Sequence, residues 1–407
     1  MRLVFVIVHR WAGLFVAVFL LVAGLTGGLI AWDHELDEAL NPEIFRAPGS
    51  GPLRGALELA DQAEREDPRL RVSYLPLRVQ RGQAQVLSVE PRATSANKPP
   101  EALGFDQLFV DPSDGKRLGQ RTWGELSLAR KNLMPFLYKL HYSLHLPSAG
   151  GVELGTVLMG LVAIVWTLDA LVALYISFPS LASWRKSFAF RLRAGGHKLT
   201  FDLHRSGGVW LWLLLFPFGV SAISMNLGEQ VVEPVVQMFS PLTPGPFDGP
   251  EPEGLPQEPL LDRHAAVRRA VEEARACGVT APAGGIFYAS ARHLYGVGFF
   301  ESGQEHGDGG LGNTWLYLNA DSGKLVAAQQ PGRGSAGDVF MQLQFPLHSG
   351  RIFGIVGRVL VTLLGLGIAT LSATGVVLWA RKRKARRATR YGGQLDASAE
   401  SKASASA

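Results

Sequence analysis

Four apolar runs, each long enough to cross a lipid bilayer, constrain the fold of this 407-residue chain more than any other feature. Residues 11–32, 206–228 and 359–380 contain no charged side chain, and residues 154–178 contain only Asp169. About 20 apolar residues span the hydrocarbon core as a helix. The first run is too long for a secretory signal peptide and lacks a clear cleavage site. We therefore expect four transmembrane helices in a lipid bilayer.

Basic residues beside these runs predict the orientation of the chain. The segment 179–205 carries six Lys or Arg residues against one acid, and seven basic residues lie within 381–390. Because Lys and Arg concentrate in cytoplasmic segments, both segments and both termini are expected in the cytoplasm, with the chain in a bacterial inner membrane. The net charge of +5 does not indicate a nucleic-acid partner, because the basic residues adjoin apolar runs.

The spans divide the chain into eight predicted segments, and the charged fraction of 18% suits such a mixture of membrane and soluble parts. From these boundaries we expect transmembrane helices in 1–32, 146–178, 206–228 and 348–380, periplasmic domains at 33–145 and 229–347, a cytoplasmic basic loop at 179–205, and a basic, then disordered, cytoplasmic tail at 381–407.

The two halves of the chain resemble each other in their membrane segments. The run VHRWAGLFVAVFLLVAGLTG opens the first half and LHRSGGVWLWLLLFPFGVSA opens the second, so a shift of 195 places His9 on His204. The closing runs YSLHLPSAGG and FPLHSGRIFG align at a shift of 203, which places His145 on His348. The sequence therefore predicts an internal two-fold repeat.

The soluble segments show the same correspondence. LFVDPSDGKRLGQR at 108–121 matches LYLNADSGKLVAAQQ at 316–330, and each predicts two short strands around an Asp/Gly turn. Helix-like amphipathic segments precede them, at roughly 55–66 and 262–276.

The matched histidines are candidate metal ligands. His9 and His204 are expected at the cytoplasmic ends of two spans, and His145 and His348 at the periplasmic ends of the other two. A single interfacial histidine is unremarkable, but two symmetry-matched pairs facing the bundle interior would supply the two axial imidazoles of a haem iron at each level. Zinc would need further ligands that no cluster supplies. With Cys277 as its one cysteine, the chain cannot attach haem by thioethers, so we expect two non-covalent, bis-histidine haem b groups.

His141 leaves the identity of the periplasmic ligand open. It lies four residues before His145, so on one helix the two would share a face. The repeat favours His145, because a shift of 203 places Gln344, which is no ligand, opposite His141.

Other polar residues are expected near these sites. Asp169 is an ionisable residue at membrane depth, where it could relay protons, bond a partner helix or serve a structural role. Four arginines beside the helix ends could pair with haem propionates or, for the first two, anchor the chain at the membrane surface: Arg10, Arg205, Arg351 and Arg358.

Four motifs together identify a family: HRWAGLFVAVFLLVAGLTG; LYKLHYSLHLP followed by WTLDALVALYISFP; DLHRSGG; and FPLHSGRIFGIVGRVL with TGVVLWARKRK. From residue 1 to about 385 the chain resembles the PepSY-associated transmembrane proteins of the iron-regulated type, and in particular inner-membrane ferric-siderophore reductases of the ferrioxamine-linked type. The resemblance implies two α+β PepSY-like periplasmic domains on four transmembrane helices. It also implies a ferric siderophore as electron acceptor, and its Leu-His pattern in LHYSL points to His141 as the ligand.

These observations predict an oxidoreductase that takes electrons from a cytoplasmic flavoprotein or quinol and passes them through haem to a periplasmic ferric siderophore, releasing iron as Fe(II). Two other functions stay open. The chain could be a membrane-anchored PepSY-type binding or regulatory protein without redox activity, or a haem conduit for another reductase partner. A regulator should lack the Soret absorbance of haem.

Overall fold

The computed structural model of the chain describes residues 1–92, 100–249 and 258–404, which group into two compact units. The first unit, here the helical unit, comprises Met1–Leu29, His141–Leu227 and Val361–Ala407. The second, here the sheet unit, comprises Ile30–Leu140 and Gly228–Leu360. Each unit therefore draws on both halves of the sequence.

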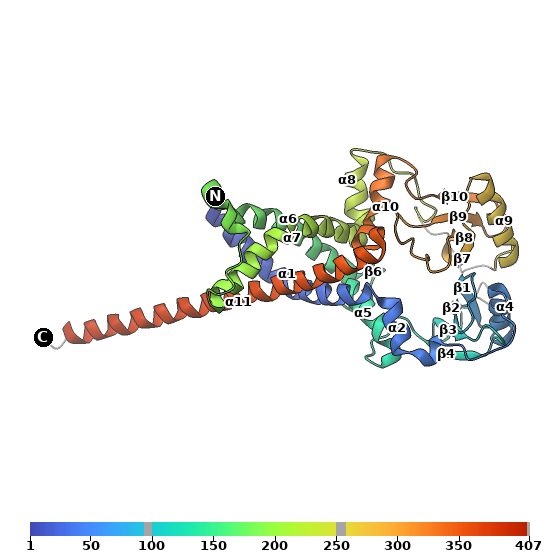
Figure 1. The fold of residues 1–407 in the computed structure, drawn as a ribbon, viewed down its shortest axis with the longest axis horizontal. Helices are drawn as coiled ribbons and strands as arrows, with labels where there is room; N and C mark the ends of the chain where they lie inside the picture. The colour runs from blue at the N-terminus through green and yellow to red at the C-terminus, as the bar shows by residue number, and fades with distance from the viewer. Residues whose placement is uncertain (93–99, 250–257, 405–407) are drawn as a thin grey trace. The chain divides into compact units, whose positions relative to one another are not determined.

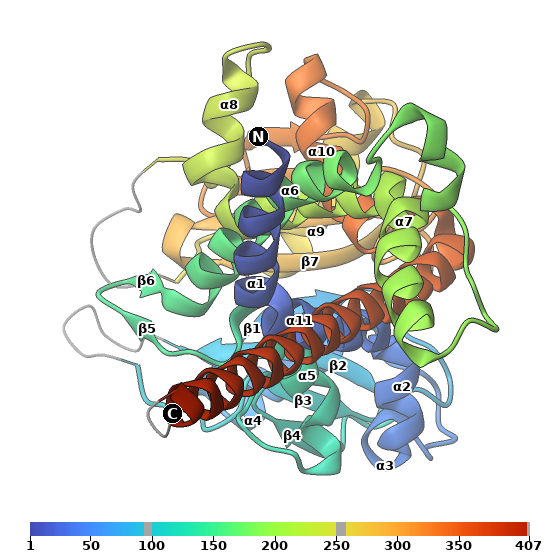
Figure 2. The same cartoon turned by 90° about the vertical axis from the view of Figure 1, so that its left-hand side faces the viewer.

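Four long apolar helices dominate the helical unit (Figure 1). They are α1 (Arg2–Ile30), α6 (Leu154–Ser177), α7 (Gly196–Leu227) and α11 (Gly354–Ser404). Figure 2 views this unit from the side on which α1 begins and α11 ends. By length and composition all four can cross a membrane, as the sequence predicts. Helices α1, α7 and α11 extend beyond the apolar runs into flanking segments that contain basic residues.

Small residues allow these helices to approach closely. A Cβ added at Gly24 of α1 would lie 2.6 Å from the carbonyl oxygen of Gly365 in α11, so a larger side chain would push the two helices apart. Between α6 and α7, the indole Nε1 of Trp212 donates a hydrogen bond of 3.0 Å to the carbonyl of Ala170. Close packing and polar contacts of this kind fix the helix registers, and with them the side chains that face the interior.

The sheet unit contains one eight-stranded antiparallel sheet with the order β10-β9-β8-β7-β1-β2-β3-β4. Its strands are β1 (Leu70–Pro76), β2 (Gln85–Pro91), β3 (Gln107–Val110), β4 (Arg117–Arg121), β7 (Ala283–Ala289), β8 (Leu294–Phe299), β9 (Thr314–Asn319) and β10 (Leu325–Gln329). The first and second soluble segments each contribute four consecutive strands. They join where β1 pairs with β7, with Tyr74 opposite Phe287 and Pro76 opposite Gly285.

Two helices pack on this sheet and share one hydrophobic core with it, α4 (Ala56–Glu66) and α9 (Arg263–Ala276) (Figure 1). Leu59 of α4 and Ala270 of α9 are fully buried in that core beside Leu87 and Leu316. Helix α9 begins where Asp262 caps it, since its carboxylate accepts the backbone N–H of Ala265 at 2.6 Å.

Shorter elements complete the chain. Its helices are α2 (Asp33–Leu40), α3 (Pro42–Phe45), α5 (Leu133–Ser143), α8 (Glu233–Gln237) and α10 (Ala336–His348). A two-stranded hairpin is formed by β5 (Ser148–Ala149) and β6 (Val152–Glu153). Short 3₁₀-helical segments lie at η1 (Arg130–Asn132), η2 (Leu181–Ser187), η4 (Ser290–Arg292) and η5 (Arg351–Phe353), and a π-helical segment lies at η3 (Gly228–Val232).

The predicted soluble elements agree with those observed. The segments 108–121 and 316–330 contain the strand pairs β3–β4 and β9–β10, and both amphipathic segments are helices, α4 and α9. Instead of two separate domains, however, the two soluble segments form one compact unit with a continuous sheet. Pairing of β1 with β7 satisfies backbone groups that each four-stranded half would leave open at its edge. The internal repeat and the division into two family domains stay predictions.

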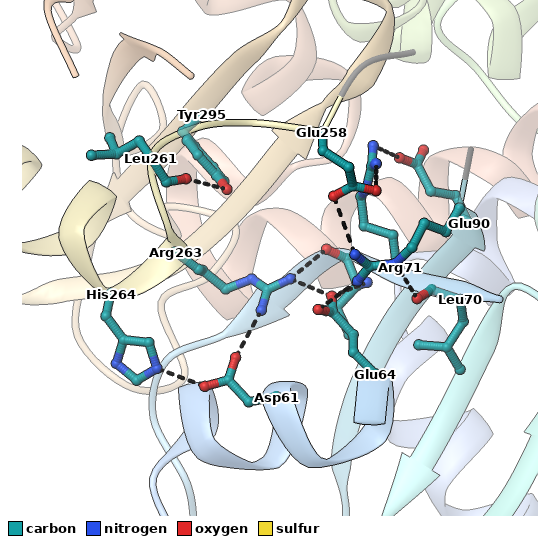
Figure 3. Close-up of polar contacts among 12 residues, drawn as sticks. Asp61, Glu64, Leu70, Arg71, Glu90, Glu258, Leu261, Arg263, His264 and Tyr295 are labelled. Atoms are coloured by element: carbon teal, nitrogen blue, oxygen red, sulfur yellow. Dashed lines mark hydrogen bonds and ion pairs between the residues drawn. The ribbon is translucent and has the colours of Figure 1, made fainter. Parts of the chain in front are cut away.

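Ion pairs reinforce the junction between the two halves of the sheet unit (Figure 3). The guanidinium of Arg263, at the start of α9, contacts Glu64 at 2.6 Å and Asp61 at 3.4 Å, both on α4. It also donates to the carbonyl of Val72 in β1. His264 Nε2 lies 2.8 Å from Asp61. Burial by itself would raise the pKa of Glu64, but attraction to Arg263 and hydrogen bonds outweigh burial and lower that pKa.

A second set of contacts centres on Arg71 of β1, which is almost fully buried. Its guanidinium pairs with Glu258 and with Glu90 (Figure 3). It also lies 5.0 Å from the ring centroid of Tyr288. Glu258 also contacts Arg92 at 3.1 Å. Buried charges are tolerated when they are paired in this way. These charged residues therefore help to hold the two halves of the sheet unit together.

Candidate functional site

A cavity of about 1480 Å³ lies among the four long helices of the helical unit. Side chains of all four helices form its wall, which includes His9, Asp169 and His204. The basic residues that line it are Arg10, Arg205, Arg381, Lys382, Arg383, Arg386 and Arg387. Among its lining residues Asp169 is the one acid, so the cavity is strongly positive.

The two histidines that the repeat matched face each other in this cavity. The ring centroids of His9 on α1 and His204 on α7 are 6.0 Å apart, and the ring planes make an angle of 43°. Sequence reasoning placed these residues at the same ends of two spans, and the packing of the helices brings the rings together.

His9 is held by a carboxylate. Its Nδ1 lies 2.9 Å and 3.0 Å from the two carboxylate oxygens of Asp169 on α6. Asp169 is only 7% exposed. Of the roles considered for this acid, the structure therefore supports a bond to a partner helix. Because a carboxylate can only accept, the proton of this bond belongs to Nδ1 of His9, so Nε2 is the nitrogen with the lone pair whenever the ring is neutral.

His204 is held by neutral groups on α11. Its Nδ1 lies 3.0 Å from the carbonyl oxygen of Leu371 and 3.3 Å from the hydroxyl of Thr374. A Cβ added at Gly375 would lie 2.9 Å from Cε1 of the ring, so only glycine leaves room for the imidazole here. The carbonyl fixes the proton on Nδ1, and Nε2 is again the lone-pair nitrogen.

The ring of His141 packs against α1 through contacts like those of His204: a bond from Nδ1 to a threonine, a bond to the backbone, and a glycine beside Cε1. We call each such set of contacts a socket. The Nδ1 of His141 lies 3.0 Å from the hydroxyl of Thr26, and its ring also bonds the backbone of Ala23. A Cβ at Gly27 would lie 2.9 Å from Cε1. The socket residues Ala23, Thr26 and Gly27 have the spacing of Leu371, Thr374 and Gly375. Sequence reasoning missed both sockets; the Thr-Gly pair common to two apolar runs was the available signal.

His145 does not share a helical face with His141, and that prediction was wrong. Helix α5 ends at Ser143, and His145 follows in left-handed backbone conformation with φ of 55°. The chain turns there because the N–H of Leu146 bonds back to the carbonyl of Ser143. His348 is the last residue of α10 in the sheet unit.

The four candidate propionate-binding arginines fall into two groups. Arg10 and Arg205 line the cavity. Arg351 instead pairs with Asp308 at 2.9 Å. Arg358 pairs with Glu35 at 2.6 Å and donates to the carbonyl of Ala31. The expectation that Arg351 and Arg358 serve propionates is therefore corrected, because acids of the sheet unit already occupy them.

The residues present fit a haem. Two imidazole nitrogens about 2 Å from one iron, on opposite sides, place their ring centroids about 6 Å apart. His9 and His204 meet this separation, and their Nδ1 atoms carry the orienting hydrogen bonds that metal-binding histidines typically make. Within the described ranges no group of three or more His, Cys, Asp or Glu residues could hold a metal ion. A haem needs only two protein ligands, because the porphyrin supplies the rest.

Comparison with known proteins agrees with this architecture. The model of the PepSY-associated TM region matches residues 6–382, nearly the whole chain. No curated protein matches the chain. The chain is a multi-pass membrane protein that belongs to the PepSY-associated TM family.

Proposed function

We propose that this protein is a haem-binding oxidoreductase that carries electrons across the bacterial inner membrane to a ferric siderophore. One observation carries the proposal: His9 and His204 face each other across a separation that suits one iron, with both Nδ1 atoms already bonded. Haem, when bound, supplies one-electron transfer. Reduction of the siderophore's Fe(III) by one electron gives Fe(II), which siderophores hold weakly.

The chain's own residues would bind and orient the group. His9 and His204 would present Nε2 to the iron, while Asp169 and the carbonyl of Leu371 keep the rings from rotating. Arg10 and Arg205 are placed beside the two histidines in the cavity wall and would neutralise the propionates.

A second haem is proposed at the other end of the spans. The socket around His141 repeats the socket around His204, so His141 is the better candidate for its first ligand. The repeat also proposes His348 as a haem ligand. His145, the alternative, follows the end of α5 in left-handed backbone conformation.

The direction and partners of electron transfer belong to the proposal as well. The basic segments beside the spans favour cytoplasmic termini. A cytoplasmic flavoprotein or quinol would then donate electrons at the level of His9 and His204. The resemblance to ferric-siderophore reductases supports the acceptor.

The test is a spectroscopic and chemical assay of the purified protein. We expect a Soret band and about two haems per chain by pyridine haemochrome assay, the number that two bis-histidine levels require. His9→Ala or His204→Ala should each remove or disturb the same haem. His197→Ala is the matched control, because His197 lines the same cavity yet has no matching histidine in the other half.

Activity is tested with the dithionite-reduced protein and a ferric hydroxamate siderophore. Rapid haem reoxidation, with Fe(II) trapped by a chromogenic chelator, is the expected result. A protein without haem would contradict the proposal and favour the regulatory alternative. If the haem is reoxidised by other acceptors but by no ferric siderophore, the proposal of a haem conduit stands and the siderophore is rejected as its acceptor.

A further inference from the structure

Asp169 is a buried carboxylate within a spanning helix, where an ionisable residue is costly and needs a partner. Its two oxygens are both directed at Nδ1 of His9. In the part of the chain that the structure describes, this histidine is its one hydrogen-bonding partner. The carboxylate is thus maintained at membrane depth for a single contact.

The other two socketed histidines bond neutral groups. His204 bonds the carbonyl of Leu371 and the hydroxyl of Thr374, and His141 bonds the hydroxyl of Thr26. A carboxylate attracts the Nδ1 proton more strongly than a carbonyl or hydroxyl does, which makes the imidazole a stronger electron donor through Nε2. Stronger donation favours the more highly charged, oxidised form of a bound metal.

We infer that Asp169 is a positioning residue that aims Nε2 of His9 into the cavity and lowers the reduction potential of the iron bound there. The inference rests on the proposed function. It gives the haem held by His9 and His204 a lower reduction potential than the haem held by His141, because His141 bonds a neutral hydroxyl. Electron transfer from the first haem to the second is then energetically downhill.

The test compares midpoint potentials in three variants of the full-length protein by spectroelectrochemical titration. Asp169→Asn keeps a side-chain acceptor of nearly the same shape but removes the charge. Asp169→Glu keeps the charge on a longer side chain. Thr167→Val is the matched control, because Thr167 is buried two residues away on the same helix and its hydroxyl donates to the carbonyl of Ala163.

We expect Asp169→Asn to retain both haems and to raise the lower midpoint potential, leaving the higher one unchanged. The low-spin electron paramagnetic resonance signal of that same haem should shift, and loss of the signal in His9→Ala identifies it. Asp169→Glu should restore the lower potential at least in part. Thr167→Val should match the wild type in both potentials.

Unchanged potentials in a haem-loaded Asp169→Asn protein would overturn this inference while leaving the proposed function intact. Equal shifts of both potentials would overturn it too, because they indicate a general structural effect. If the Asp169→Asn protein loses this haem, the Asp169→Glu protein provides the test. A lower midpoint potential equal to that of the wild type supports the inference, and a raised one rejects it. A wild-type protein without haem overturns the proposed function, and the inference with it.

Discussion

The junction within the sheet unit and the cavity of the helical unit use their charged residues in opposite ways. In the sheet unit, arginines are matched to acids: Arg263 contacts Glu64 and Asp61, and Arg71 contacts Glu258. In the helical unit, seven basic residues line a cavity whose one acid is already bonded to His9. None of those seven forms an ion pair with a residue that the structure describes.

This difference distinguishes charged residues that stabilise the fold from charged residues that are placed to bind a ligand. Paired charges cost little to bury and add specificity where two segments meet. Unmatched cations around two facing imidazoles suit an anionic group that binds a metal, which describes a haem with its propionates. The comparison predicts that substitutions of the cavity-lining residues in the helical unit change haem binding, whereas substitutions of the ion-paired residues in the sheet unit change stability.

The largest expected effect is the loss of a whole haem. His141→Ala should remove or disturb one of about two haems per chain, because it empties the socket formed by Thr26 and Gly27. His145→Ala should leave both haems bound, since His145 lies beyond the end of α5 in left-handed backbone conformation. Haem content and the low-spin absorbance bands are the measurements. The opposite pattern would restore His145 as the ligand and remove the parallel between the two sockets.

The next effect tests the sheet unit. Arg263→Ala should lower the free energy of unfolding by about 3 kcal/mol, because it leaves the carboxylate of Glu64 partly buried without its main partner. Urea denaturation followed by tryptophan fluorescence in detergent measures this loss, and the haem content should not change.

Arg269→Ala is the control for that variant. Arg269 lies on the same helix, is 49% exposed, and pairs with Glu272 and Glu273 on its own helix. Its removal should cost less than about 1 kcal/mol. If both substitutions cost the same, the charge pairs between α4 and α9 do not stabilise the sheet unit, and the contrast between the two units fails.

Much of this architecture could be predicted from the sequence. Uncharged runs of about 20 residues mark membrane helices directly, and the Asp/Gly turns at 108–121 and 316–330 located two of the strand pairs. The pairing of His9 with His204 also followed, because matched positions in two similarly directed helices lie at the same level.

The remaining features depend on contacts that no local pattern reveals. Nothing in the strand β1 or β7 indicates that they pair with each other, because edge pairing depends on the folded halves meeting. The Thr-Gly pairs mark where the two sockets lie, but they do not name the histidine that each one holds. His204 bonds the carbonyl of Leu371, 167 residues away, and backbone acceptors have no sequence signature. The sequence shows that Asp169 is an ionisable residue in an apolar run, but only the packing of α1 against α6 reveals that its partner is His9.

The smallest predicted effect is a pH dependence confined to the sheet unit. The pKa of Glu64 lies below its ordinary value of 4.5, because attraction to Arg263 and hydrogen bonds outweigh the opposing effect of burial. A carboxylate with a lowered folded-state pKa stabilises the fold above the unfolded pKa, and that stabilisation is lost as the pH falls through the folded pKa. Glu64→Gln should therefore be less stable than the wild type at pH 7, and the difference should shrink below about pH 4.5 as the wild-type carboxylate takes up its proton.

Urea midpoints from pH 7 to pH 3 give the two profiles. Glu66→Gln, an exposed change on the same helix, should leave the profile unchanged. Wild-type and Glu64→Gln profiles that stay parallel across this range would show that the charge of Glu64 does not hold α4 to α9.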